Sequence, residues 1–156
     1  MRNRRRSSFS RTAPRIFDAR RPSLPDFVLD SHAVLAFLFG EPGAPEVRGI
    51  LEEAARAEQA LLMSVVNWAE ALCRIRRHEG HRGVARAGAF AEEMRITIAE
   101  ADVALAEAAA EFKAEHRMSL ADAFAAALAQ REDAELVTGD PELRPLKGII
   151  KLRWIG

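Results

Sequence analysis

A short apolar segment, Phe27-Val28-Leu29, followed directly by Asp30, constrains the fold of this chain more than any other feature. Three apolar residues between Pro25-Asp26 and an acidic residue are typical of a strand buried on both faces, at the centre of a parallel sheet. Asp30 then lies at the carboxyl end of that strand. Ligands of open α/β sheets bind at this edge, where loops leave the strands and helix N-termini point inward. We therefore expect Asp30 to belong to a functional site.

Strand and helix patterns alternate along the rest of the chain. The apolar spacing predicts helices over 31–39, 44–57, 65–79, 83–94, 101–116 and 119–132. Short apolar or alternating runs predict further strands over 60–64, 95–98, 136–138 and 149–152. This order predicts an α/β fold, a three-layer α/β/α sandwich around a mostly parallel sheet of about five strands.

The first 24 residues differ in composition from the remainder. They hold eight arginines against the single Asp18 and show no helical or alternating periodicity. We expect a disordered, Arg-rich N-terminal extension over 1–24 and one domain over 25–156. Two interpretations of the extension stay open: a segment upstream of a start near Asp26, or an arm whose arginines add affinity for RNA.

The composition of the domain argues against nucleic-acid binding by bulk charge, against a disulfide-bonded fold and against a membrane span. Residues 25–156 carry 15 Lys and Arg against 22 Asp and Glu, so bulk charge does not favour nucleic acid and any such chemistry needs a local site. The single cysteine, Cys73, excludes an internal disulfide and agrees with a cytoplasmic location; we expect it to be buried. No apolar run approaches the roughly 18 residues of a membrane span, so we expect no membrane contact.

Four carboxylates lie beside predicted strand ends or on otherwise apolar helices: Asp30, Glu70, Asp122 and Asp140. Each has a local alternative. Asp30 and Asp140 could cap the helices that follow them. Asp122 could form a capping box with the residue three positions earlier, and Glu70 could pair with Arg74 on a helix surface.

Together the four carboxylates point to a cation. Glu70 and Asp122 lie in apolar helical surroundings, where a lone carboxylate is costly. Four of them at one crevice would repel one another and raise their pKa values unless a cation were bound. Carboxylates without a cluster of Cys or His suit Mg²⁺ or Mn²⁺, which activate water for phosphodiester cleavage.

The same segments resemble the PIN-domain ribonucleases, and within them the VapC-type toxins of bacterial toxin–antitoxin pairs. The matching runs are Val28-Leu29-Asp30-Ser31-His32-Ala33, Asn67-Trp68-Ala69-Glu70-Ala71-Leu72, Ser119-Leu120-Ala121-Asp122-Ala123-Phe124 and Val137-Thr138-Gly139-Asp140-Pro141-Glu142. The order Asp, Glu, Asp, Asp fits over residues 27–156. The long basic extension departs from the pattern, because such toxins usually begin just before the first strand.

The resemblance implies a metal-dependent endoribonuclease. Asp30, Glu70, Asp122 and Asp140 would be the catalytic residues and would hold Mg²⁺ or Mn²⁺. Thr138 would orient Asp140, and Ser31 would support the site from beside Asp30. The implied partners are an RNA substrate, a cognate antitoxin and a second copy of the chain in a homodimer.

Two weaker signals lie beside these residues. The one basic stretch of the domain could hold RNA phosphates or form a solvated helix face; it consists of Arg74, Arg76, Arg77, Arg82 and Arg86. His32 follows the first strand in an apolar helix, where we expect it to pack rather than to do chemistry.

Two rival functions remain. A phosphatase of the haloacid-dehalogenase type also uses an aspartate after its first strand, but it needs a second Asp two positions later, where this chain has His32. A non-catalytic module with an acidic pocket is the other rival. RNA cleavage with and without EDTA separates all three.

Overall fold

The computed structural model describes residues 26–156, so the expectations for the N-terminal extension lie outside it. One sheet carries five strands in the order β3-β2-β1-β4-β5, and every neighbouring pair is parallel. The strands are β1 (Phe27–Leu29), β2 (Leu61–Ser64), β3 (Ile96–Ala99), β4 (Glu135–Thr138) and β5 (Leu152–Trp154). The predicted α/β fold is confirmed, with β1 at the centre and a sheet that is wholly parallel.

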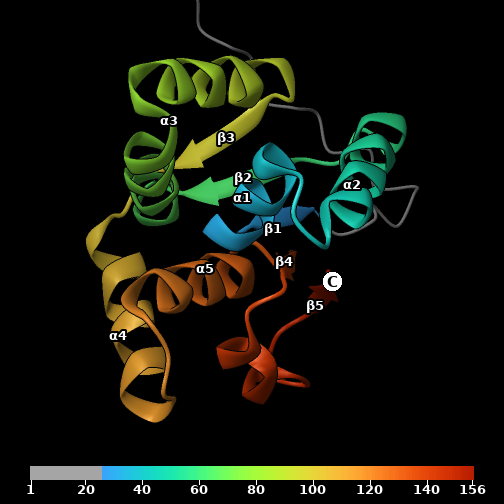
Figure 1. The fold of residues 1–156 in the computed structure, drawn as a ribbon. Helices are drawn as coiled ribbons and strands as arrows, with labels where there is room; N and C mark the ends of the chain where they lie inside the picture. Colours follow the sequence, from blue (N-terminus) through green and yellow to red (C-terminus); the bar gives the residue numbers. More distant parts are fainter. Residues whose placement is uncertain (1–25) are drawn as a thin grey trace, which may run out of the picture.

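Helices cover both faces of this sheet (Figure 1). They are α1 (Ser31–Phe39), α2 (Ala44–Ala57), α3 (Val65–Glu93), α4 (Val103–Glu115), α5 (Leu120–Arg131) and the short 3₁₀ helix η1 (Pro141–Leu146). One core cluster joins the sheet to α1, α2 and α3, and a second joins it to α4, α5 and η1. None of the helices in the described part of the chain has the length and apolar character that crossing a membrane requires.

The central strand β1 contributes to both cores. Phe27 and Leu29 pack in the cluster with α1, α2 and α3, whereas Val28 packs in the cluster with α4 and α5. All three side chains are 0% exposed. Successive side chains of a strand point to opposite faces, and both faces are covered here, which explains why the segment is apolar throughout.

Six of the 12 residues of helix α5 are alanines. Every residue from Ala121 to Ala129 is buried, because the helix lies between the sheet and α4 (Figure 1). Alanine side chains permit this close approach. Asp122 is the one charged residue in that buried run, and its position therefore needs a separate explanation.

The last strand lies further along the chain than the sequence predicts. The apolar pair Ile149-Ile150 suggested a strand over 149–152, but β5 begins at Leu152. Gly148 has a φ of 90°, Ile149 is 53% exposed, and Ile150 makes only an isolated bridge to Lys147. The residues before β5 therefore form a turn.

Helix α3 joins the two helices expected over 65–79 and 83–94. It is sharply bent at Gly80, where φ is 69° and ψ is −156°, a conformation that glycine adopts far more readily than other residues (Figure 1). Cys73 lies exposed on this helix, so the prediction of a buried cysteine was wrong.

Candidate functional site

A small acidic pocket lies at the carboxyl edge of the sheet. Asp30 follows β1 and Asp140 follows β4; because these strands are parallel neighbours, both aspartates emerge at one edge. Helices α3 and α5 bring Glu70 and Asp122 to the same place. The pocket has a volume of about 260 Å³ and is lined by Ser31, His32, Glu70, Arg74, Ser119, Asp122, Asp140 and Glu142.

Asp30 is the most deeply buried of the carboxylates, with 1% of its surface exposed. Its Oδ1 caps α1 by accepting a hydrogen bond from the Ala33 amide at 2.7 Å. No hydrogen bond reaches its buried Oδ2 from any described residue. Burial raises the pKa of Asp30 to about 7, and the charges of Asp122 and Asp140 add to this rise while the Thr138 hydroxyl and the Ala33 amide oppose it.

Asp122 is 5% exposed and forms a capping box at the start of α5. Its Oδ2 accepts a hydrogen bond from Ser119 Oγ at 2.7 Å, and its amide donates to Ser119 Oγ at 3.0 Å. Burial raises the pKa of Asp122, the bonds from Ser119 lower it, and the charges of Asp140 and Glu70 raise it further. The capping role and the electrostatic coupling to the other carboxylates therefore exist together.

Ser31 connects α1 to α3, because its hydroxyl donates a hydrogen bond to Glu70 Oε2. The alternative of an ion pair between Glu70 and Arg74 is not seen among residues 26–156, although both side chains line the pocket. Glu70 is thus held toward the first strand and its helix rather than along its own helix surface.

Asp140 is held by the residues on either side of it. Its amide donates to Thr138 Oγ1 at 3.0 Å, and its Oδ1 accepts from the Glu142 amide at 2.9 Å, which caps η1. Thr138 itself is completely buried. This side chain therefore lies between the backbone of Asp140 and the carboxylate of Asp30, whose pKa it lowers.

The sequence did not predict three of the lining residues, Ser119, Glu142 and His32, as part of the site. Glu142 adds a fifth carboxylate side chain to the region; its spacing two residues after Asp140, at a helix start, was the available signal. His32 was expected to pack, and its half-buried ring does lie against Gly139, but it also forms part of the pocket wall. An apolar helix gave no signal for this placement, because the side facing the pocket depends on how α1 meets β4.

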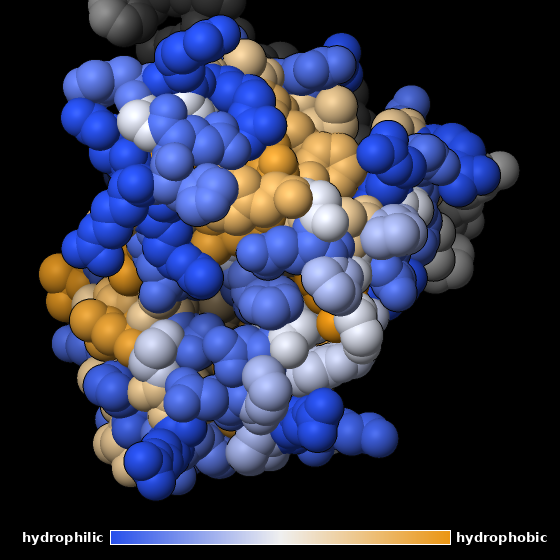
Figure 2. Space-filling view, viewed as in Figure 1, coloured by the Kyte–Doolittle hydropathy of each residue, from blue (hydrophilic) through white to orange (hydrophobic). Residues whose placement is uncertain are grey.

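Of the predicted arginines, the structure brings Arg74 into the pocket. Arg76, Arg77 and Arg82 are exposed on α3 outside the pocket lining. Figure 2 shows that the surface over α3 is mostly hydrophilic. The guanidinium of Arg76 contacts His81 Nε2 at 2.9 Å, so this arginine is engaged on its own helix.

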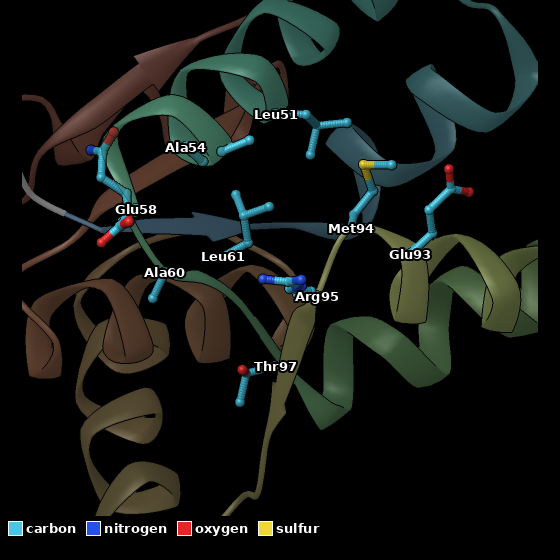
Figure 3. A pocket seen from close by; sticks show the side chains of 11 residues that line it. Leu51, Ala54, Glu58, Ala60, Leu61, Glu93, Met94, Arg95 and Thr97 are labelled. Carbon is cyan, nitrogen blue, oxygen red and sulfur yellow. The ribbon is translucent and has the colours of Figure 1, made fainter. Parts of the chain in front are cut away.

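A larger cavity, of about 730 Å³, lies at the opposite edge of the sheet. Figure 3 shows it between α2 and the first residues of β2 and β3, with Leu51, Leu61 and Met94 on its walls. None of the predicted site residues lines it. Size alone therefore does not mark the site, and the acidic pocket at the carboxyl edge carries the chemically distinctive groups.

The types of side chain in the pocket suit a divalent cation, but their positions do not form a set of ligands around one ion. Within residues 26–156 no three Asp, Glu, His or Cys side chains are arranged to ligate one ion. The carboxylates are turned instead onto caps and hydroxyls. Even so, the carboxylates offer oxygen atoms, which are the ligands that hard cations prefer. Asp30 Oδ2 is buried and accepts no hydrogen bond from the described residues, so a bound cation would satisfy it.

The protein is therefore an α/β protein with a wholly parallel sheet and an acidic pocket at the carboxyl edge of that sheet. The profile of the PIN domain matches residues 27–148, which is most of the chain, and the chain belongs to the PIN domain family. Comparison with curated protein sequences gives no significant match.

Solved structures share the fold at low sequence identity. A chain of the Rickettsia felis VapBC2 complex, bound to promoter DNA, superposes with a TM-score of 0.69 at 16% identity over 83% of this chain and 98% of that one. A Klebsiella pneumoniae toxin–antitoxin complex gives 0.61 at 22% identity over 82% and 96%. Mycobacterium tuberculosis VapC20, described as a toxin that cleaves the sarcin–ricin loop, gives 0.58 at 17% identity over 71% and 87%.

The raised pKa of Asp30 predicts a pH-dependent stability in the absence of divalent cations. The folded state binds this proton more tightly than the unfolded state, so the stabilisation is complete below pH 4 and is lost as pH rises through about 7. The loss amounts to roughly 4 kcal/mol. In EDTA, the melting temperature of the parent should fall between pH 5 and pH 8 by several degrees more than that of Asp30→Asn.

The exposed Asp133 provides a matched control, because Asp133→Asn makes the same chemical change outside the pocket. This variant should keep the pH dependence of the parent. If the melting temperatures of the parent and of Asp30→Asn fell by the same amount between pH 5 and pH 8, the assignment of a protonated, buried Asp30 would be contradicted.

Proposed function

We propose that this PIN-domain protein is a metal-dependent endoribonuclease and the toxin component of a toxin–antitoxin pair. The observation that carries the proposal is the convergence of Asp30, Glu70, Asp122 and Asp140 on one edge of the sheet. The structural neighbours support it, since VapC20 is described as a toxin that cleaves the sarcin–ricin loop and the Klebsiella pneumoniae neighbour is described as a toxin–antitoxin complex.

The cation we propose is Mg²⁺ or Mn²⁺. PIN domains generally use divalent metal ions, and the acidic oxygen donors suit hard cations. Asp30 and Asp140 would hold the ion from the strand ends, with Asp122 and Glu70 facing them from α5 and α3. When bound, the cation would lower the pKa of a water molecule and neutralise charge on the phosphate.

The remaining chemistry falls to the side chains of the pocket. Water attacks the phosphorus in line with the leaving oxygen, and Glu70 or Asp140 accepts a proton from the water. The bond between phosphorus and the leaving oxygen breaks, and that oxygen takes up a proton from solvent. Ser31 holds Glu70 in place through its hydroxyl, and Thr138 does the same for the Asp140 backbone. Both hydroxyls therefore act through the carboxylates that they position.

We assign phosphate contacts to the face of α3 that carries Glu70. Arg74 is one turn beyond Glu70 and lines the pocket, which suits it to the scissile phosphate. Arg77 lies nearly one turn further on the same face and would reach a neighbouring phosphate. Arg76 lies off this face by helical periodicity and Arg82 lies beyond the bend at Gly80, so a solvated surface is the simpler assignment for these two exposed side chains.

The proposed partners follow from the acidic pocket and from the relatives. An RNA-cutting site must be held inactive, and carboxylates attract a basic side chain, so we expect the cognate antitoxin to place Arg or Lys near Asp30 and Asp140. We propose a cytoplasmic location, where the RNA substrate is found, and we expect the toxin to be a homodimer. We propose that the nuclease domain spans residues 25–156.

Replacing Asp122 by Asn tests the proposed activity. The change keeps the side-chain volume but removes a charge from the pocket, so RNA cleavage in Mg²⁺ or Mn²⁺ should fall by about a hundredfold or more. EDTA should abolish cleavage by the parent, and the cation should raise the melting temperature of the parent more than that of the variant. Asp133→Asn should cut RNA at the parental rate.

Cleavage by Asp122→Asn at the parental rate would show that the site is assigned wrongly. No cleavage by the parent in either cation would favour the acidic binding module, and phosphomonoester hydrolysis without RNA cleavage would favour the phosphatase.

Co-expression with the untagged product of the neighbouring gene tests the partner. The toxin should purify with that protein and should cut RNA only after the complex is dissociated. Recovery of active, unbound protein from cells that express both genes would count against the toxin–antitoxin assignment.

A further inference from the structure

We infer that His32 contacts the RNA backbone, donating a hydrogen bond to a phosphate or ribose oxygen beside the scissile bond. The inference rests on the proposed ribonuclease function and adds a residue that binds the substrate. His32 is the second residue of α1, two positions after Asp30, and lines the acidic pocket. It makes no hydrogen bond or ion pair within residues 26–156, so its ring nitrogens are not used by the fold.

The position of the ring depends on a close approach to Gly139. A Cβ at residue 139 would lie 2.7 Å from His32 Nε2 and equally close to the Ile155 carbonyl oxygen, so only glycine leaves room for the imidazole there. Gly139 lies between Thr138 and Asp140 at the end of β4. The ring is thereby held beside the carboxyl end of the strand that carries Asp140, rather than in either apolar core.

Hydrogen-bond donors are scarce on the lining of this pocket. The hydroxyl of Ser31 donates to Glu70, and the hydroxyl of Ser119 donates to Asp122. Among the side chains that line the pocket, this leaves Arg74 and His32 as free donors, one on α3 and the other on α1. An RNA backbone is rich in acceptors and is repelled by the carboxylates, so binding requires such donors.

Imidazole suits this role at any pH of interest. A histidine ring keeps at least one N–H in the neutral form and two in the charged form, so it can donate to an oxygen in both. Arg74 and His32 would hold the backbone from two sides while the carboxylates face the phosphate between them. The contact therefore acts on substrate binding, separately from the cation.

The test compares His32→Leu, which fills the space without a donor, with His32→Gln, which restores an N–H near the position of Nε2. His78→Leu is the matched control, because His78 packs on Phe39 outside the pocket. The probe is a fluorescent oligoribonucleotide that spans a site cut by the parent in total RNA. The kinetic constants kcat and KM are measured in saturating Mn²⁺, along with the Mn²⁺-induced shift in melting temperature.

We expect His32→Leu to raise KM about tenfold, the effect of one lost hydrogen bond to a charged or polar acceptor. His32→Gln should recover most of the loss, and His78→Leu should match the parent. All variants should keep the parental Mn²⁺ shift. If His32→Leu does not fold, His32→Ala takes its place with the same expectations.

Parental KM in the variant without a donor, or no recovery in His32→Gln, would overturn the inference while leaving the ribonuclease function standing. A lost Mn²⁺ shift would also overturn it, because His32 would then act on the cation. A parent that cuts no RNA in Mn²⁺ would remove the proposed function and this inference together.

Discussion

The burial of Asp30 is the constraint on which the rest of the site depends. A carboxylate with 1% of its surface exposed, one oxygen without a hydrogen-bond partner and further acidic groups nearby is unfavourable when ionised. The fold tolerates it by capping α1 and by holding a proton near neutral pH. A divalent cation would satisfy the same atom without the proton. The unfavourable electrostatics of the carboxylate cluster and the proposed chemistry therefore have one origin.

The sheet order converts separate sequence segments into this site. Because β1 is central and pairs in parallel with β4, the residues that follow the two strands, Asp30 and Asp140, lie at the same edge of the sheet. The buried, alanine-rich α5 supplies Asp122 from the opposite face, and α3 supplies Glu70. Capping holds three of these carboxylates in place, so the local roles foreseen for Asp30, Asp122 and Asp140 are present along with the shared pocket.

The sequence predicts whatever a short pattern determines. The run Phe27-Val28-Leu29 required a central parallel strand, and a carboxylate within the apolar start of α5 indicated a special environment. It could not locate β5, because Ile149-Ile150 is as apolar as a strand but follows a glycine that turns the chain. The sequence also did not predict the position of His32. That position depends on Gly139, whose lack of a side chain leaves room for the imidazole ring next to the end of β4.

The central claim is that a divalent cation completes the carboxylate cluster and displaces the proton of Asp30. Isothermal titration of Mn²⁺ at pH 7, in two buffers of different ionisation enthalpy, measures both events. Since the pKa of Asp30 is about 7, binding should release at least about half a proton per chain, and Asp30→Asn should bind more weakly without that release. Absence of binding, or binding by the parent without proton release, would contradict the account.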